Sequence, residues 1–177
     1  MKTFFNTKRL CRAAVIAALY TALTYVFMPF AYGPFQVRPA EALCILPLFY
    51  AEAIPALAVG CALSNLASPY IFDVIFGPLV TLLAAFITYL VGQYVKKEGM
   101  KLFLGGLPPV LFNALLLPIY IIFLCGGGEN YASAAIAYGA WFFSLFLTQS
   151  VWVYALGSPL QYTITRLQER HISAFLK

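Results

Sequence analysis

The sequence predicts an all-α protein: an integral membrane bundle of six transmembrane helices, forming one domain over residues 1–177. Composition is the first reason, because 63% of the 177 residues are hydrophobic and only 10% are charged. The mean hydropathy of +0.87 agrees. A soluble domain carries about 25% charged residues, so this much apolar surface is expected to face lipid. The second reason is that glycine and proline separate long apolar runs.

Six apolar runs define the expected helices. They are Leu10–Ala31, Ala40–Ala51, Ile54–Ala67, Phe72–Val95, Leu104–Cys125 and Ala132–Tyr162. A helix that crosses the bilayer needs about 20 residues, and the second and third runs are shorter than that. Such segments are tolerated where they line a cavity or pack inside the bundle.

The first and last runs each need a separate justification. Lys8, Arg9 and Arg12 lie at the start of the first run, as basic residues also do in a signal peptide. The length of this run suits a retained spanning helix, which is the interpretation we favour. The last run is longer than a bilayer requires, and the segment Gly157–Pro159 predicts a bend in it.

Charge predicts the orientation. Ten of the eleven Lys and Arg residues fall in three clusters that flank apolar runs. The clusters are Lys2, Lys8, Arg9 and Arg12; Lys96, Lys97 and Lys101; and Arg166, Arg170 and Lys177. With six spans all three lie on one side, which the positive-inside rule makes cytoplasmic together with both termini. This clustering beside apolar runs also argues against nucleic-acid binding, which needs an exposed basic face.

Polar residues beside the apolar runs are the strongest indication of a function. A carboxylate near hydrocarbon is costly and by default marks a ligand or ion site. In the predicted topology five polar residues from different segments share the outer end: Arg38, Glu41, Asn65, Asp73 and Glu129. We therefore expect a polar pocket that opens to the outside.

Each of these residues also has a purely structural alternative. Arg38 and Glu41 are three residues apart and could form a local ion pair. Asp73 could cap the start of its helix, and Asn65 could end its helix as a C-cap. Glu129 could simply be a solvated loop residue.

Three further polar or aromatic residues lie within the fifth and sixth runs. Asn113 and Gln149 could make hydrogen bonds between helices, and Gln149 could also form the floor of a pocket. Trp141 could belong to an aromatic belt at the membrane surface or could stack on a flat heterocycle.

Alanines recur every four residues in the first run, at Ala14, Ala18 and Ala22. Small residues at this spacing allow close helix approach in lipid. The spacing alone leaves internal packing and docking to another membrane protein equally open.

Known catalytic motifs are absent from the sequence. There is no Walker A loop, no H-E-x-x-H and no G-x-S-x-G, and the four cysteines form no C-x-x-C pair. We therefore expect no metal site, no cofactor and no ATPase activity of the chain's own. An intramembrane enzyme using Glu41 and Asp73 as acid and base stays the weaker alternative.

Three segments resemble the QueT family, and the resemblance covers nearly the whole chain. They are Gln36–Phe49 (QVRPAEALCILPLF), Gly60–Gly77 (GCALSNLASPYIFDVIFG) and Tyr154–Leu160 (YALGSPL). The resemblance implies a substrate-binding S component of an energy-coupling factor (ECF) transporter, with six helices and a micronutrient site on the outer face. Such a component works with a transmembrane T component and two cytoplasmic ATPase subunits. QueT members are assigned to queuosine precursors, which are deazaguanine bases.

The resemblance also implies roles for individual residues. Ala14, Ala18 and Ala22 match the alanine-rich first helix that contacts the T component. A carboxylate such as Glu41 or Asp73 suits the adjacent N–H donors of a guanine-like edge.

On the same ligand, Asn65 or Gln149 could read carbonyl and ring nitrogen atoms, and Trp141 could stack on the ring. Family members often carry an acid where this chain has Gln149. That difference favours a neutral deazapurine over one with a cationic aminomethyl group, and leaves another vitamin or base-like micronutrient as the alternative substrate.

Overall fold

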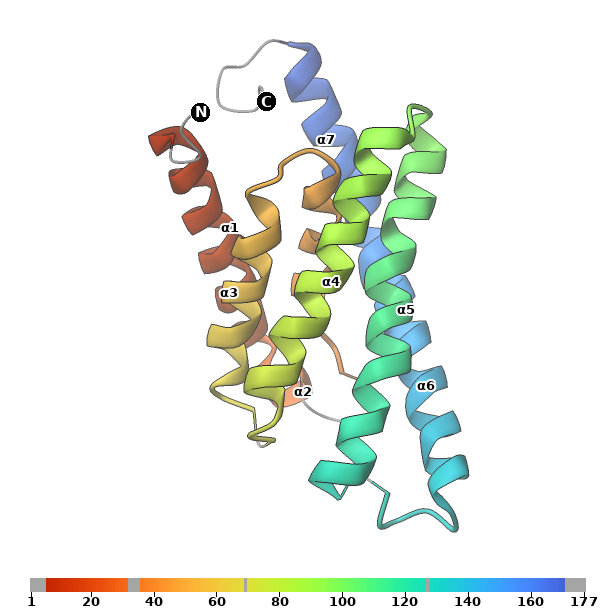
Figure 1. The fold of residues 1–177 in the computed structure, drawn as a ribbon. Coiled ribbons are helices and arrows are strands. Elements are labelled where there is room, and N and C mark those ends of the chain that lie inside the picture. The colour runs from red at the N-terminus through yellow and green to blue at the C-terminus, as the bar shows by residue number, and fades with distance from the viewer. Residues whose placement is uncertain (1–5, 32–35, 69, 127, 171–177) are drawn as a thin grey trace.

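The computed structural model describes residues 6–31, 36–68, 70–126 and 128–170, so Lys2 and Lys177 of the basic clusters lie outside the described ranges. Regular structure within these ranges is entirely helical, which confirms the predicted all-α class (Figure 1). The elements are α1 (Thr7–Val26), α2 (Met28–Ala31), η1 (Pro39–Leu48), α3 (Ala53–Asn65), α4 (Asp73–Tyr94), α5 (Glu98–Cys125), α6 (Ala134–Ser150), η2 (Val151–Leu156) and α7 (Gly157–Glu169).

Four helical stretches are long and apolar enough to cross a membrane. They are α1, α4, α5 and the continuous stretch Ala134–Glu169 that joins α6, η2 and α7. The two remaining apolar segments, η1 and α3, are shorter. The count of six spans and the cytoplasmic position of the termini stay predictions.

The two ends of the bundle differ in chemistry (Figure 1). At one end α1 begins, α4 is followed by α5, and α7 terminates. We call this the basic end, because it carries the described lysines and arginines other than Arg38. The opposite end, where α3 terminates and α4 begins, is called the site end.

The segment η1 forms the centre of the bundle. All ten of its residues are buried, and it contacts α1, α3, α4, α5, η2 and α7. The sequence predicts a helix over Ala40–Ala51, whereas the structure has a 3₁₀ helix over Pro39–Leu48 with Pro47 inside it. A 3₁₀ helix rises about 2.0 Å per residue against 1.5 Å for an α-helix. Ten residues therefore span roughly 20 Å, which lets a short segment reach through most of the core.

Glycines allow close packing around the end of η1. A methyl group added to Gly92 of α4 would lie 2.5 Å from the Leu48 carbonyl oxygen. One added to Gly105 of α5 would lie 2.4 Å from the Leu48 side chain. Leu48 is fully buried between these two helices, so α4 and α5 both fix the position of η1.

The last helical stretch changes geometry earlier than the sequence predicts. A bend is expected at Gly157–Pro159, but a π-helical turn already occupies Val151–Leu156. Pro159 has no N–H to donate to the carbonyl four residues before it. A π turn shifts the hydrogen-bond register by one residue and so accommodates this missing donor.

Candidate functional site

Most of the polar residues singled out by the sequence are buried towards the site end. The exposed fractions of Arg38, Glu41, Asn65, Asp73 and Asn113 are 5%, 2%, 1%, 2% and 5%. Buried charges must be paired or hydrogen-bonded to be tolerated. The hydrogen bonds around them fall into two centres, one at each carboxylate.

Glu41, in the first turn of η1, is the first centre. The Tyr20 hydroxyl on α1 donates to Glu41 Oε1 over 2.7 Å. The Cys44 thiol donates to Oε2 over 3.2 Å, and Asn113 Nδ2 on α5 donates to the same oxygen over 3.4 Å. In a 3₁₀ helix residues three apart eclipse each other, which places Cys44 directly beside Glu41. The carboxylate therefore ties α1 and α5 to the central segment.

Asp73, the first residue of α4, is the second centre. Its carboxylate accepts hydrogen bonds from the Ser68 hydroxyl, over 2.6 Å, and from the Tyr120 hydroxyl on α5. Arg38 Nη2 lies 3.9 Å from Asp73 Oδ2, while Arg38 Nε donates to the Ala31 carbonyl over 2.9 Å. The structure thus pairs Arg38 with Asp73, a partner that the three-residue spacing to Glu41 does not predict.

Asn65 links α3 to the start of α4. It is the last residue of α3, as the sequence predicts, and its Nδ2 donates to the Asp73 carbonyl over 2.8 Å. The close approach requires Gly77, where an added methyl group would lie 2.3 Å from Asn65 Nδ2. Within the described ranges, the buried Asn65 Oδ1 has no hydrogen-bond partner.

Gln149 and Trp141 are buried in α6, with exposed fractions of 1% and 6%. Trp141 belongs to an apolar cluster that also contains Tyr120, the partner of Asp73. Gln149 lies just before η2, which packs against η1. Its buried Oε1 has no hydrogen-bond partner among the described residues.

The structure therefore brings five predicted residues into contact with one of the two centres: Arg38, Glu41, Asn65, Asp73 and Asn113. Glu129 is exposed and stands outside the hydrogen bonds described above. Sequence reasoning missed Tyr20, Cys44, Ser68 and Tyr120, which donate to the two carboxylates. The available signal was a tyrosine within an apolar run, because a buried phenol needs a hydrogen-bond partner.

The alanine stripe of α1 lies on the outside of the bundle. Ala14, Ala18 and Ala22 are all exposed. Internal packing of α1 uses another face, where a methyl group on Gly60 of α3 would lie 2.9 Å from Tyr20 Cβ. The Thr21 hydroxyl on this face reaches the Gly60 carbonyl over 3.2 Å. The stripe is therefore open to a neighbour in the membrane.

A comparison with known protein families shows which family the chain belongs to. The family model described as QueT transporter matches residues 10–166. The chain belongs to the QueT transporter family. Together with the four apolar helical stretches, membership identifies a QueT-family multi-pass membrane protein that functions in transport.

A curated relative gives a partial match. The protein named "Queuosine precursor transporter QueT" from Lactococcus lactis subsp. cremoris (strain MG1363) is 36% identical over 87 residues. The match covers 48% of this chain and 52% of the relative, so the chain spans about half the length of that protein. No solved structure matches the chain significantly.

Proposed function

We propose that this QueT family member is the substrate-binding S component of an ECF transporter and takes up a queuosine precursor, a deazaguanine base. The proposal is based on two buried carboxylates, Glu41 and Asp73. Hydrogen-bond donors from five elements or loops surround them. Burying such acids is costly in a membrane protein, so their presence supports a ligand-binding role. The named relative transports queuosine precursors, which supports the same substrate class.

The unsatisfied atoms of the site also favour a ligand rich in N–H donors. Asn65 Oδ1 and Gln149 Oε1 are acceptors, as is the buried Gln36 Oε1 near the start of η1, and none has a partner among the described residues. A buried acceptor without a donor costs about 1–3 kcal/mol. The ring and amino N–H groups of a deazaguanine would satisfy such acceptors and the carboxylates together.

Asn113 and Trp141 complete the proposed site. Asn113 Nδ2 already donates to Glu41, so it can hold the carboxylate in place or transfer its hydrogen bond to a ligand carbonyl. Trp141 offers a flat buried face within the cluster that contains Tyr120, and stacking on a purine-like ring is a favourable use of such a face.

Energy would come from partner proteins. In the proposal, Ala14, Ala18 and Ala22 dock on a T component, which two ATPase subunits drive from the cytoplasm. Their exposure supports this assignment, because small residues permit close helix contact in lipid. The basic end faces the cytoplasm, so the site end faces outward.

A binding experiment tests the substrate. We expect tryptophan fluorescence of the purified protein to change saturably on titration with a deazaguanine base, and not with folate or unrelated vitamins. Glu41→Gln and Asp73→Asn should each weaken binding at least about ten-fold, because a charge-assisted hydrogen bond is lost. The exposed acid Glu129 provides the matched control, and Glu129→Gln should bind normally. Unchanged binding in the double variant Glu41→Gln, Asp73→Asn would contradict the assignment.

An uptake experiment tests the coupling. Cells that express the chain together with a T component and ATPase subunits should accumulate the labelled base, whereas cells without the ATPase subunits should only bind it. Equal accumulation in both strains would show that the chain transports on its own.

A further inference from the structure

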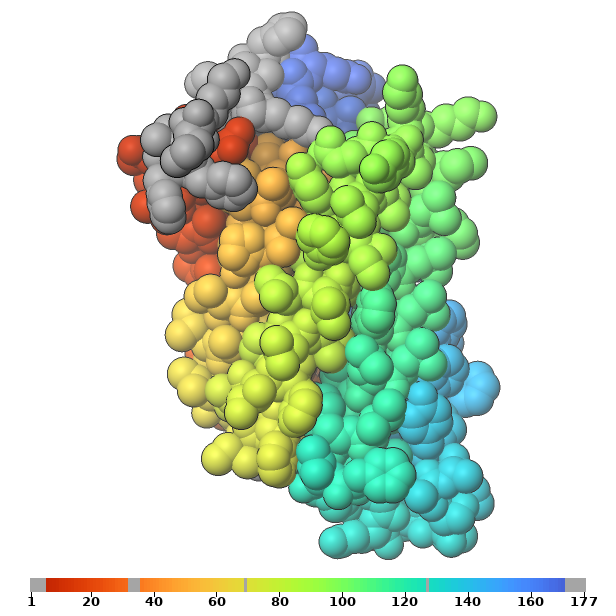
Figure 2. Space-filling model, in the orientation of Figure 1, coloured from red at the N-terminus to blue at the C-terminus, as the bar shows by residue number. Residues whose placement is uncertain are grey.

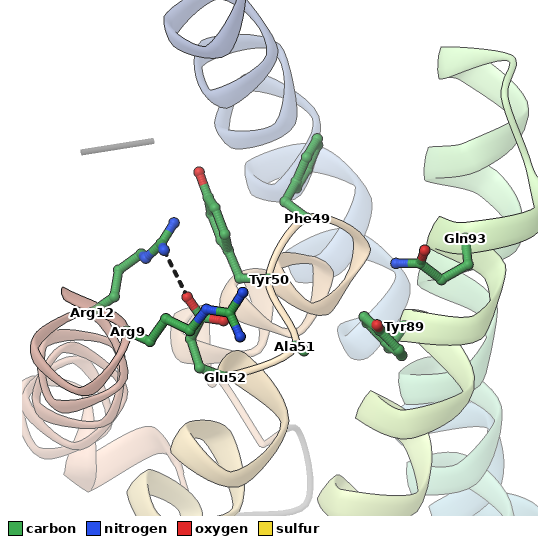
Figure 3. Close-up of a pocket in the computed structure, with 8 residues that line it drawn as sticks. All are labelled: Arg9, Arg12, Phe49, Tyr50, Ala51, Glu52, Tyr89 and Gln93. Carbon is green, nitrogen blue, oxygen red and sulfur yellow. Dashed lines mark ion pairs between the residues drawn. The ribbon is translucent and has the colours of Figure 1, made fainter. Parts of the chain in front are cut away.

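A polar cavity lies at the basic end of the bundle (Figure 3), away from the site end where Asp73 begins α4. Its volume is about 150 Å³, which is several times the roughly 30 Å³ that a water molecule occupies in the liquid. Three elements line it: the start of α1, the turn between η1 and α3, and the last part of α4.

One wall of the cavity is fixed by a partly buried ion pair. Arg12 Nη2 lies 2.9 Å from Glu52 Oε1, and the two side chains are only 15% and 14% exposed. The Arg12 guanidinium also lies over the Tyr50 ring, 4.3 Å from its centre, while Gln168 of α7 donates to the Tyr50 hydroxyl over 3.4 Å. Burial raises the pKa of the Tyr50 phenol, so it remains neutral. Arg12 and Glu52 thus cancel in charge and hold the turn in place.

Arg9 supplies a charge that this wall does not neutralise. It lies three residues before Arg12 on α1, is exposed, and within the described ranges has no ion-pair partner. Figure 3 shows its guanidinium extending from α1 towards the turn that closes the cavity. The lining therefore carries one net positive charge, from two arginines and one glutamate.

The α4 side of the cavity adds neutral donors. Tyr89 and Gln93 lie four residues apart on α4 and so share one face of that helix. A phenol and a carboxamide both donate to oxygen acceptors. Arginine is the side chain best suited to phosphate oxygens, because its planar fork donates two parallel hydrogen bonds.

The depth of the cavity matches the level of lipid headgroups. Arg9 is in the first turn of α1, and Gln93 precedes the last residue of α4. Both helices are long and apolar enough to span, so their ends lie near the membrane surface. Lys8, Lys96 and Lys97 surround the same end, and basic residues at this level attract anionic lipids.

We propose that this cavity binds a monoanionic phosphate group, held by Arg9 with Tyr89 and Gln93 and supplied by an anionic lipid headgroup or by free phosphate. The proposal is independent of the substrate assigned above. A bound phosphate would join α1 to α4 across the turn that carries η1 into α3. It would therefore stabilise the folded protein in proportion to its occupancy.

The test measures thermal unfolding of the full chain in a mild detergent. Three additions are compared: phosphatidylglycerol, phosphatidylcholine with the same acyl chains, and inorganic phosphate. Phosphatidylcholine is the charge control, because its quaternary ammonium cancels the phosphate charge and is repelled by Arg9. We expect phosphatidylglycerol to raise the unfolding temperature more than phosphatidylcholine does.

Variants then locate the effect. Arg9→Gln should weaken phosphatidylglycerol binding about five-fold, the share of one arginine near an anionic surface. Lys8→Gln is the matched control, because Lys8 is exposed, adjacent and outside the cavity lining. An Arg9-dependent shift with inorganic phosphate would identify free phosphate as the source. Equal losses in the two variants, or no shift with any addition, would overturn the proposal.

Discussion

At the scale of single residues, two tyrosine hydroxyls account for how the carboxylates are tolerated. Tyr20 donates to Glu41 and Tyr120 donates to Asp73. Hydrogen bonds to charged groups are stronger than those between neutral groups, and the cost of losing one in a buried place is large. Each hydroxyl therefore contributes more to the stability of the folded protein than a hydrogen bond between two neutral groups would.

Replacing Tyr20 tests this directly. Tyr20→Phe keeps the ring and removes the donor to the buried Glu41, so we expect a loss of roughly 1–2 kcal/mol in stability. Tyr25→Phe is the control on the same helix, because its hydroxyl donates to the Leu63 carbonyl at an exposed position. Thermal unfolding in detergent should show a clearly larger decrease for Tyr20→Phe. Equal decreases would mean that the Tyr20–Glu41 bond contributes little.

Sequence reasoning succeeds and fails at this scale for a physical reason. Glu41 and Asp73 could be singled out from the sequence because an acid beside an apolar run is rare and costly. The structure shows that both are buried, and their contact with a ligand stays a prediction. Tyr20 and Tyr120 could not be singled out, because tyrosine is frequent in this chain and its partner depends on which helices meet. The pairing of Arg38 with Asp73 likewise depends on which segments meet in the folded protein.

At the scale of elements, the apolar runs predicted where the helices lie but not their type. The long helix α4 follows its run closely, whereas α5 begins at Glu98 rather than at the predicted Leu104. The 3₁₀ form of η1 and the π turn of η2 depend on prolines and on the packing of neighbours. Hydrophobic periodicity gives no signal for the 3₁₀ form of η1, because this segment is buried on every side.

The close approach of glycines to η1 leads to a prediction about how this segment is packed. Gly92→Ala would place a methyl group against the Leu48 backbone, and such overpacking typically costs about 1–3 kcal/mol. Gly139→Ala is the matched control on α6, where an added methyl group has no neighbour within 4 Å. It should be neutral or stabilising by up to about 1 kcal/mol. Thermal unfolding compares the two, and a Gly92→Ala protein as stable as the Gly139→Ala protein would contradict this packing.

At the scale of the whole molecule, charge separates the two ends. Both the beginning of α1 and the end of α7 lie at the basic end (Figure 1), and the space-filling view shows an elongated molecule along this axis (Figure 2). The long helices have exposed apolar residues such as Phe86 on α4, Phe123 on α5 and Phe143 on α6. These surfaces suit lipid, so the long axis of the bundle runs across the membrane.

Thiol labelling of intact cells tests the orientation. In a background where the partly accessible Cys11 and Cys125 are replaced by serine, Glu129→Cys should react with a membrane-impermeant maleimide. Lys97→Cys should react only after the cells are permeabilised, because the basic end is expected inside. Labelling of Lys97→Cys in intact cells would reverse the topology and place Glu41 and Asp73 towards the cytoplasm.

The burial of every residue in η1 has a mechanical consequence. Glu41 and Leu48 belong to one short, stiff rod and lie roughly 14 Å apart along it. Leu48 is held on two sides, because Gly92 of α4 lies against its backbone and Gly105 of α5 lies against its side chain. A ligand that displaced Glu41 along this rod would therefore also push on Leu48, where α4 and α5 pack against η1.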